Sequence, residues 1–129
     1  MNIEHLAIWV SDLEKTKAFY EKYFDARAGA LYRNQNKKFS SYFLNFENGC
    51  RLELMHRPDI NKQDKNYQNQ NLGLVHFAIS VGSKEKVDSL TMQLRNDGFE
   101  IVSEPRTTGD GYYETVILDP ENNIVEITV

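Results

Sequence analysis

The sequence contains little that would link the protein to disulfide bonds, nucleic acid or a membrane surface. Cys50 is the single cysteine, so the chain can form no intrachain disulfide. Basic residues are scattered: 15 lysines and arginines stand against 19 aspartates and glutamates, which gives a net charge of −4 and no basic cluster. Proteins that bind nucleic acid or anionic lipid present basic patches, so neither partner class has compositional support.

Long apolar runs are absent as well. No run approaches the roughly 20 residues needed to span a bilayer. The first residues lack a basic region followed by an apolar core, so we expect no secretory signal and a cytoplasmic protein. Hydrophobic residues make up 40% of the chain and charged residues 26%, which is typical of a globular protein. We therefore expect one domain over residues 1–129.

What the chain does contain is one order of patterns that occurs twice. In the first half, residues 2–10 have the pattern of a strand, and Ser11 opens a helix with Glu14 as its capping-box partner. Three strand candidates follow, at 28–34, 39–46 and 51–57, with a turn at 47–49. The first half therefore predicts the order β-α-β-β-β.

The second half repeats this order after a polar connection at 58–71. Residues 74–81 have a strand pattern, Ser83 opens a helix, and Gly98 ends it. Strand candidates follow at 99–104, 112–118 and 123–129, with a turn at 119–122. We expect an α+β fold of two duplicated βαβββ modules, at about 1–57 and 72–129.

The repeat includes four residues that can bind a metal. The stretch HLAIWV aligns with HFAISV, so His5 corresponds to His76. The last strand of each half carries an acidic residue, Glu53 in RLELM and Glu126 in IVEITV, at nearly the same distance from its histidine. Strand alternation places one His and one Glu of each half on the sheet face away from the helix. If the two sheets curve toward each other, these four side chains meet.

Two imidazoles and two carboxylates suit a divalent ion such as Zn, Ni, Co or Fe(II). Imidazole favours these ions over magnesium, and a carboxylate can also serve as a base. For any single residue, a packed histidine or a solvent-facing glutamate is the commoner case. Because four residues match across a repeat, we favour metal binding.

The whole chain, over residues 2–128, resembles the vicinal oxygen chelate superfamily, also called the glyoxalase/bleomycin resistance/dioxygenase family. The motifs that carry this resemblance are HLAIWVSDLEKTKAFYEKYF, LVHFAISV and LDPENNIVEI. The resemblance implies two βαβββ modules whose curved mixed sheets surround a metal site. It is specific for the superfamily and much less so for the reaction.

The ligand set resembles that of glyoxalase I, also called lactoylglutathione lyase, which uses two His and two Glu. The implied metal ligands are His5, Glu53, His76 and Glu126. The implied substrate is a small oxo compound or thiol hemithioacetal, with Glu126 as the catalytic base and Glu53 as a residue that can share that role. Ring-cleaving dioxygenases use two His and one Glu, and epimerases of the family typically have Gln at the position of Glu53. Bleomycin-resistance members bind drugs without this ligand set.

The predicted substrate-binding residues depart from the glyoxalase I pattern. Trp9 stands where bacterial glyoxalase I usually has a glutathione-binding arginine, and the Asn-Trp that tends to follow the ligand strand is absent. Trp9 either floors an apolar substrate pocket or packs at a subunit interface, and we leave both open. Arg51 shares the predicted face of Glu53, so it is a better carboxylate-binding candidate than Arg33. Tyr113 is a candidate for contact with the substrate, although packing is its default interpretation.

We therefore expect a metal-dependent lyase or isomerase that acts on a small molecule, forms a homodimer, and binds neither nucleic acid nor a membrane. Two alternatives stay open. One is another enzyme of the same fold, an epimerase or a ring-cleaving dioxygenase. The other is a small-molecule binding or resistance protein without catalysis.

Overall fold

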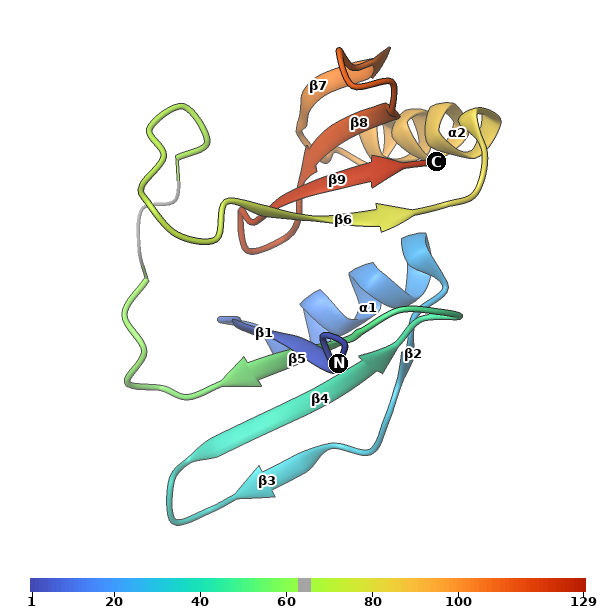
Figure 1. Cartoon of the computed structure of the whole chain (residues 1–129). Helices are drawn as coiled ribbons and strands as arrows, with labels where there is room; N and C mark the ends of the chain where they lie inside the picture. The colour runs from blue at the N-terminus through green and yellow to red at the C-terminus, as the bar shows by residue number, and fades with distance from the viewer. Residues whose placement is uncertain (63–65) are drawn as a thin grey trace. The chain divides into compact units, whose positions relative to one another are not determined.

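The computed structural model describes residues 1–62 and 66–129 (Figure 1). The chain divides into two compact units, Met1–Gln63 and Asp64–Val129, and each is described by itself. Part of the predicted polar connection, residues 63–65, lies outside the described residues. The unit made by each half contains one helix and one sheet, so the expected α+β class with two βαβββ-like modules is confirmed.

The first unit contains a five-stranded sheet with one helix. Its elements are β1 (His5–Trp9), α1 (Leu13–Phe24), β2 (Arg27–Ala28), β3 (Tyr32–Asn34), β4 (Phe39–Asn45) and β5 (Arg51–His56). The strand order is β1-β5-β4-β2, and β3 also pairs with β4. The first strand runs parallel to β5, whereas the other pairs are antiparallel. The first and last strands of the unit are therefore neighbours.

The segment predicted as one strand at 28–34 forms two short strands, so the prediction of a single continuous strand was wrong. Ala28 pairs with Leu44, but Tyr32 pairs with Ser41, so the register shifts by one residue between β2 and β3. An extra residue on one strand of an antiparallel pair interrupts the ladder and bends the strand. Gly29 still donates its backbone N–H to the carbonyl of Phe43 at 2.9 Å, which keeps the segment beside β4.

The N-terminus of α1 also differs from the prediction. The capping residue is Asp12, whose Oδ1 accepts a hydrogen bond from the backbone N–H of Lys15 at 2.9 Å. Ser11 lies one residue earlier, so it does not open the helix. Glu14 is not a capping-box partner either: its carboxylate accepts from the Tyr42 hydroxyl at 2.7 Å and pairs with Lys17 at 2.5 Å. Both Ser and Asp are favoured caps, and the sequence alone does not choose between adjacent ones.

The second unit contains a four-stranded sheet with one helix. Its elements are β6 (His76–Ser80), α2 (Lys84–Asn96), β7 (Ile101–Thr107), β8 (Tyr113–Leu118) and β9 (Ile124–Thr128). The strand order is β6-β9-β8-β7, and β6 runs parallel to β9. Ser83 caps α2, as predicted, with its side chain accepting from the N–H of Lys86. Gly98 follows the helix with φ +86°, a left-handed conformation that glycine adopts at no steric cost.

Each helix lies against one face of the sheet in its own unit (Figure 1). The apolar core of the first unit is aromatic and leucine-rich: Phe19, Tyr20, Tyr23, Phe24, Tyr42, Leu44, Leu52 and Leu54. The apolar core of the second unit is smaller and aliphatic: Val87, Leu94, Ile117, Leu118, Val125 and Ile127. Neither α1 nor α2 has the length and apolar character that crossing a bilayer requires, which holds for every helix in residues 1–62 and 66–129. We call the face of each sheet that lies away from its helix the helix-free face.

The capping assignment predicts different costs for two adjacent substitutions. Asp12→Ala should lower the free energy of unfolding by about 1 kcal/mol, because it removes the acceptor for a free N–H at the start of α1. Ser11→Ala should cost clearly less. Urea denaturation of the two variants beside wild type measures the difference, and the reverse order of costs would contradict Asp12 as the cap.

Candidate metal centre

In the first unit, a histidine and a glutamate meet on the helix-free face. The parallel register of β1 and β5 places Ala7 opposite Glu53 and His5 opposite Arg51. His5 Nε2 lies 3.9 Å from Glu53 Oε2. The His5 side chain is 40% exposed and the Glu53 side chain 14% exposed, so the carboxylate is the more enclosed partner. The two side chains present one imidazole nitrogen and one carboxylate to the same point.

The second unit has the same construction. The parallel register of β6 and β9 places Ala78 opposite Glu126 and His76 opposite Ile124. His76 Nε2 lies 3.2 Å from Glu126 Oε1, and the side chains are 39% and 20% exposed. In both units the histidine begins the first strand, and the glutamate stands opposite the residue two positions later. Each half therefore pairs one imidazole with one carboxylate, as strand alternation predicts.

Each pair by itself could supply two protein ligands. Within residues 1–62 and 66–129, no group of three or more His, Cys, Asp or Glu side chains is gathered as a metal site. Transition-metal sites in proteins use three or four protein ligands. One pair alone therefore cannot form such a site, although an imidazole nitrogen and a carboxylate oxygen are donor types that Zn, Ni, Co and Fe(II) accept.

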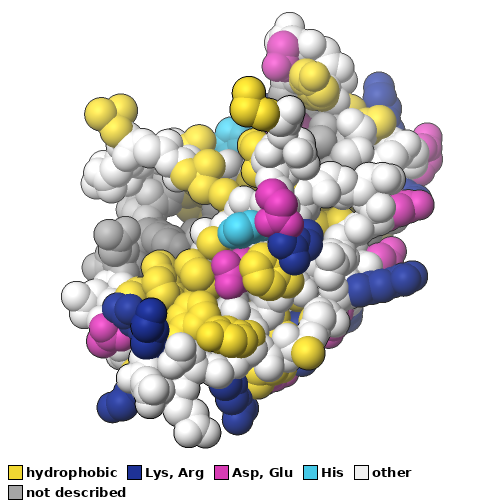
Figure 2. Space-filling view, turned by 60° about the horizontal axis from the view of Figure 1, so that its bottom comes forward, with side chains coloured by type: hydrophobic (Ala, Val, Ile, Leu, Met, Phe, Trp, Pro, Cys, Tyr) yellow, Lys and Arg dark blue, Asp and Glu magenta, His cyan; other side chains and the backbone are white. Residues whose placement is uncertain are grey.

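Glu4 adds a carboxylate beside the first pair. Its Oε2 accepts a hydrogen bond from His5 Nδ1, and its Oε1 accepts one from the Arg51 guanidinium. These two hydrogen bonds, to His5 first and then Arg51, hold the pKa of Glu4 below its usual value. Arg51 also lies over the ring of Phe43, with its guanidinium carbon 4.1 Å from the ring centre. In Figure 2, one histidine side chain lies among acidic and basic side chains and beside an area of hydrophobic ones.

Glu114 adds a carboxylate to the helix-free face of the second unit. The register of β8 and β9 places Val116 opposite Glu126 and Glu114 two residues further along, so both glutamates point to the same side. The Glu114 side chain is 13% exposed, and Arg106 lies 3.7 Å from it. Burial first, and then the charge of Glu126, raises the pKa of Glu114 above its usual value. Ionisation of Glu114 is therefore less favourable in the folded protein than in the unfolded chain.

Aromatic side chains occupy the helix-free face of the first unit away from the His5–Glu53 pair. The Trp9 ring meets Phe39 edge to face, with ring centres 6.1 Å apart, and Phe39 in turn contacts Tyr32. Arg57 lies over Trp9 at 5.6 Å. Trp9 is 38% exposed and Tyr32 55% exposed. This platform is compatible with both open interpretations of Trp9, a substrate pocket or an interface.

The other two predicted substrate-binding residues occupy different positions. Arg51 lies on the face of Glu53, as predicted, where its guanidinium is engaged by Glu4. Tyr113 lies on the opposite side of its sheet from Glu126. Its hydroxyl donates to Asp88 of α2 at 2.7 Å, and Lys84 lies over its ring. The structure therefore brings Arg51 to a His–Glu pair and does not bring Tyr113 to one, and substrate binding by either stays a prediction.

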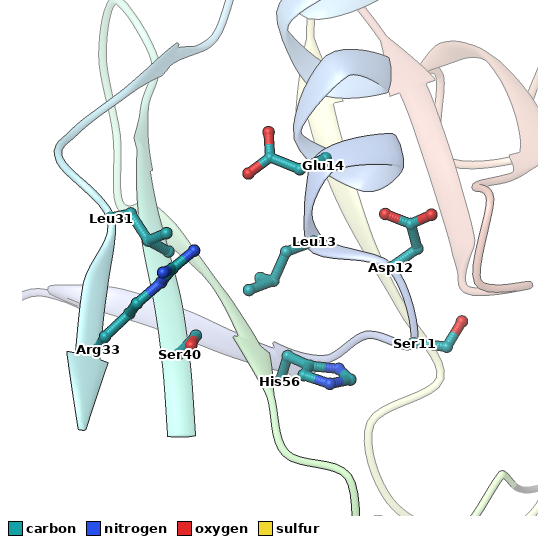
Figure 3. A pocket seen from close by; sticks show the side chains of 8 residues that line it. All are labelled: Ser11, Asp12, Leu13, Glu14, Leu31, Arg33, Ser40 and His56. Carbon is teal, nitrogen blue, oxygen red and sulfur yellow. The ribbon is translucent and has the colours of Figure 1, made fainter. Parts of the chain in front are cut away.

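A separate pocket of about 240 Å³ lies in the first unit, at the start of α1 (Figure 3). It is lined by Ser11, Asp12, Leu13, Glu14, Leu31, Arg33, Ser40 and His56. His56 is on the helix side of β5, opposite to Glu53, and its Nδ1 donates to the carbonyl of Val10 at 3.0 Å. His56 therefore lies away from the His5–Glu53 pair.

Sequence reasoning missed Glu4 and Glu114. Strand alternation alone would put Glu4 on the face opposite to His5, but β1 begins at His5, so alternation does not reach Glu4. Its signal is an acidic residue directly before the first ligand candidate. The turn predicted at 119–122 would pair residue 118 with residue 123 and would put Glu114 on the face opposite to Glu126. The observed register pairs Leu118 with Ile124 instead, which puts both glutamates on one face.

Comparison with known proteins places this geometry among related folds. Residues 2–127 match the model of the Glyoxalase/Bleomycin resistance protein/Dioxygenase superfamily. A domain with that same description from Frankia sp. EAN1pec has a TM-score of 0.84 at 18% identity, over 100% of this chain and 97% of that one. No curated protein sequence matches the chain.

Two solved glyoxalase I structures are also similar. A mutant of the Zea mays enzyme has a TM-score of 0.80 at 23% identity, over 98% of this chain and 44% of that one. The trypanothione-dependent glyoxalase I of Leishmania major has a TM-score of 0.78 at 20% identity, over 99% of this chain and 86% of that one. At these identities the likeness shows a shared fold.

The raised pKa of Glu114 predicts a pH-dependent gain from Glu114→Gln. In the metal-free protein at pH 7, this variant should be more stable than wild type, because it removes a charge that the folded state disfavours. The gain should vanish below the ordinary glutamate pKa, where Glu114 is protonated in both folded and unfolded states, and grow as the pH rises through the raised value. Urea denaturation at pH 3.5 and pH 7 measures it, with the exposed Glu100→Gln as control. A variant less stable than wild type at pH 7 would contradict this account.

Proposed function

Because the chain belongs to the Glyoxalase/Bleomycin resistance protein/Dioxygenase superfamily, we propose that it is a metal-dependent enzyme of the glyoxalase I type. The observation that supports this most is the duplicated pair: each half presents one His Nε2 and one Glu carboxylate to a common point. The substrate in this proposal is a small oxo compound or the hemithioacetal of a 2-oxoaldehyde with a thiol.

The proposed ion is held by both pairs, with His5 and Glu53 from the first half and His76 and Glu126 from the second. The chemistry of the donors supports this: two neutral imidazoles suit Zn, Ni, Co or Fe(II), and two carboxylates offset the charge of a divalent ion. The separations of 3.9 Å and 3.2 Å are those of side chains able to bind one ion between them. We propose a homodimer, in which the two pairs of one site come from one chain or from two.

When bound, the ion would act as a Lewis acid toward the two substrate oxygens. The residues of the chain move the proton. In an isomerisation of this kind, a carboxylate removes a proton from one carbon of the substrate and returns a proton to its neighbour. We assign this role to Glu126, with Glu53 as the residue that can share it. Both carboxylates are largely enclosed, at 20% and 14% exposure, so few water molecules can reach them.

Specificity in this proposal comes from the helix-free face around the two pairs. The Trp9, Phe39 and Tyr32 platform would contact an apolar part of the substrate. Arg51 would supply charge near a substrate carboxylate, but only by sharing its guanidinium with Glu4. Tyr113 points to α2 and is not included in the proposed site.

The proposal predicts that activity depends on Glu126 and on the metal. Wild type should isomerise methylglyoxal hemithioacetals, and a chelator should abolish the activity until Zn, Ni, Co or Fe(II) is restored. Glu126→Gln should lower kcat by roughly 10²–10⁴-fold, the usual contribution of a positioned base. Glu100→Gln, an exposed change in the same unit, should leave kcat unchanged.

Assays of several thiol adducts, with metal content measured for each variant, separate loss of the base from loss of the ion. Oxygen consumption with Fe(II) and no isomerisation would replace this proposal with a dioxygenase. Tight ligand binding with no turnover, in a metal-free protein, would replace it with a binding or resistance function.

A further inference from the structure

We propose that Glu4 is a positioning residue for the metal centre: it fixes the ring and the tautomer of His5, so that His5 Nε2 is the nitrogen offered to the ion. This inference rests on the proposed function for its consequence, because a ligand is positioned only if a metal binds. Its structural part, the state of the His5 ring, does not depend on any metal.

The carboxylate of Glu4 is held between two donors. One oxygen accepts from His5 Nδ1, and the other accepts from the guanidinium of Arg51. Arg51 is itself held from behind by the ring of Phe43, which it overlies at 4.1 Å. The His5 ring meets the same Phe43 ring edge to face, with centres 5.3 Å apart and planes at 87°. Arg51 and His5 therefore share one support, the Phe43 ring, and Glu4, which is 59% exposed, bridges the two.

The direction of the hydrogen bond decides the tautomer. An ionised carboxylate has no proton to donate, so it can only accept. His5 Nδ1 must therefore carry the hydrogen, and in the neutral ring Nε2 then carries the free lone pair. His5 Nε2 is the nitrogen that faces Glu53, at 3.9 Å. A carboxylate on the far nitrogen of a metal-binding histidine also raises the basicity of the near one.

The second half has no acidic residue directly before its histidine, so the two histidines differ in what their Nδ1 atoms can contact. The residue before His76 is Val75, an apolar side chain at the position that corresponds to Glu4. Within residues 1–62 and 66–129, the ionic partner of His76 is Glu126, which faces Nε2 at 3.2 Å. His76 can therefore place its hydrogen on Nε2, toward Glu126, until an ion displaces it. In this proposal the tautomer of His5 is therefore fixed before an ion binds, whereas His76 has to move its hydrogen from Nε2 to Nδ1.

Nitrogen-15 NMR of the metal-free protein near pH 8 tests the structural part, because the shifts of Nδ1 and Nε2 report which nitrogen carries the hydrogen. The chain has three histidines, and His56→Gln assigns one set of signals. His5 should show the Nδ1–H form in wild type and lose its preference in Glu4→Ala, while His76 stays unchanged. An Nε2–H form of His5 in wild type, or no change in Glu4→Ala, would overturn the proposal.

Titration with Zn²⁺ against a chromophoric chelator tests the consequence. Glu4→Ala should weaken Zn²⁺ binding roughly 10–100-fold, the usual cost of losing such a second partner. Glu4→Gln, which keeps an acceptor oxygen but no charge, should lose less, and the exposed Glu47→Ala in the same unit should lose nothing. Equal losses in Glu4→Ala and Glu4→Gln, with the His5 tautomer intact, would mean that Glu4 acts by charge alone and would overturn positioning.

Failure of the proposed function and failure of the proposed role of Glu4 give different results. If wild type binds no Zn²⁺, Ni²⁺, Co²⁺ or Fe²⁺, the proposed function fails, and the NMR result alone decides whether Glu4 sets the tautomer of His5. If wild type binds the ion and Glu4→Ala binds it equally well, the metal centre stands and the role of Glu4 is contradicted.

Discussion

The interaction on which the rest of the structure depends is the parallel pairing of the first strand of each module with its last strand. In the first unit β1 lies beside β5, and in the second β6 lies beside β9. This pairing brings together residues that are far apart in the sequence, and its register decides which ones. A one-residue slip would turn either glutamate to the helix side, because side chains alternate between faces. The two His–Glu pairs therefore exist because of register.

The apolar cores hold that register. Leu52 and Leu54 alternate with Glu53 along β5, and Val125 and Ile127 alternate with Glu126 along β9. Burying such side chains against the helix contributes on the order of 1.5–3 kcal/mol each, so a slipped strand would lose several such contributions at once. The helices thus stabilise the strands on one face and leave the other face free for chemistry. Both modules use one sheet face for the apolar core, although the residues of the two cores differ.

The sequence was sufficient to predict the order of elements, the duplication and the face of each His–Glu pair. These follow from period-2 patterns and from one module being a second copy of the other. It was not sufficient where neighbouring choices are nearly equal in energy. Asp12 rather than Ser11 caps α1, and an extra residue divides the strand expected at 28–34. Glu4 was missed because its position depends on contacts with His5 and Arg51 before β1 begins, where no periodicity applies.

The most direct test of the central proposal, that a metal ion is held by both kinds of His–Glu pair, is the metal content of the purified chain. Elemental mass spectrometry should find close to one equivalent of Zn, Ni, Co or Fe per chain in wild type and in His56→Gln. It should find almost none in His5→Ala or in His76→Ala, because each half supplies only two ligands. Metal that survives loss of either histidine, or wild type that takes up none of these ions, would contradict the account.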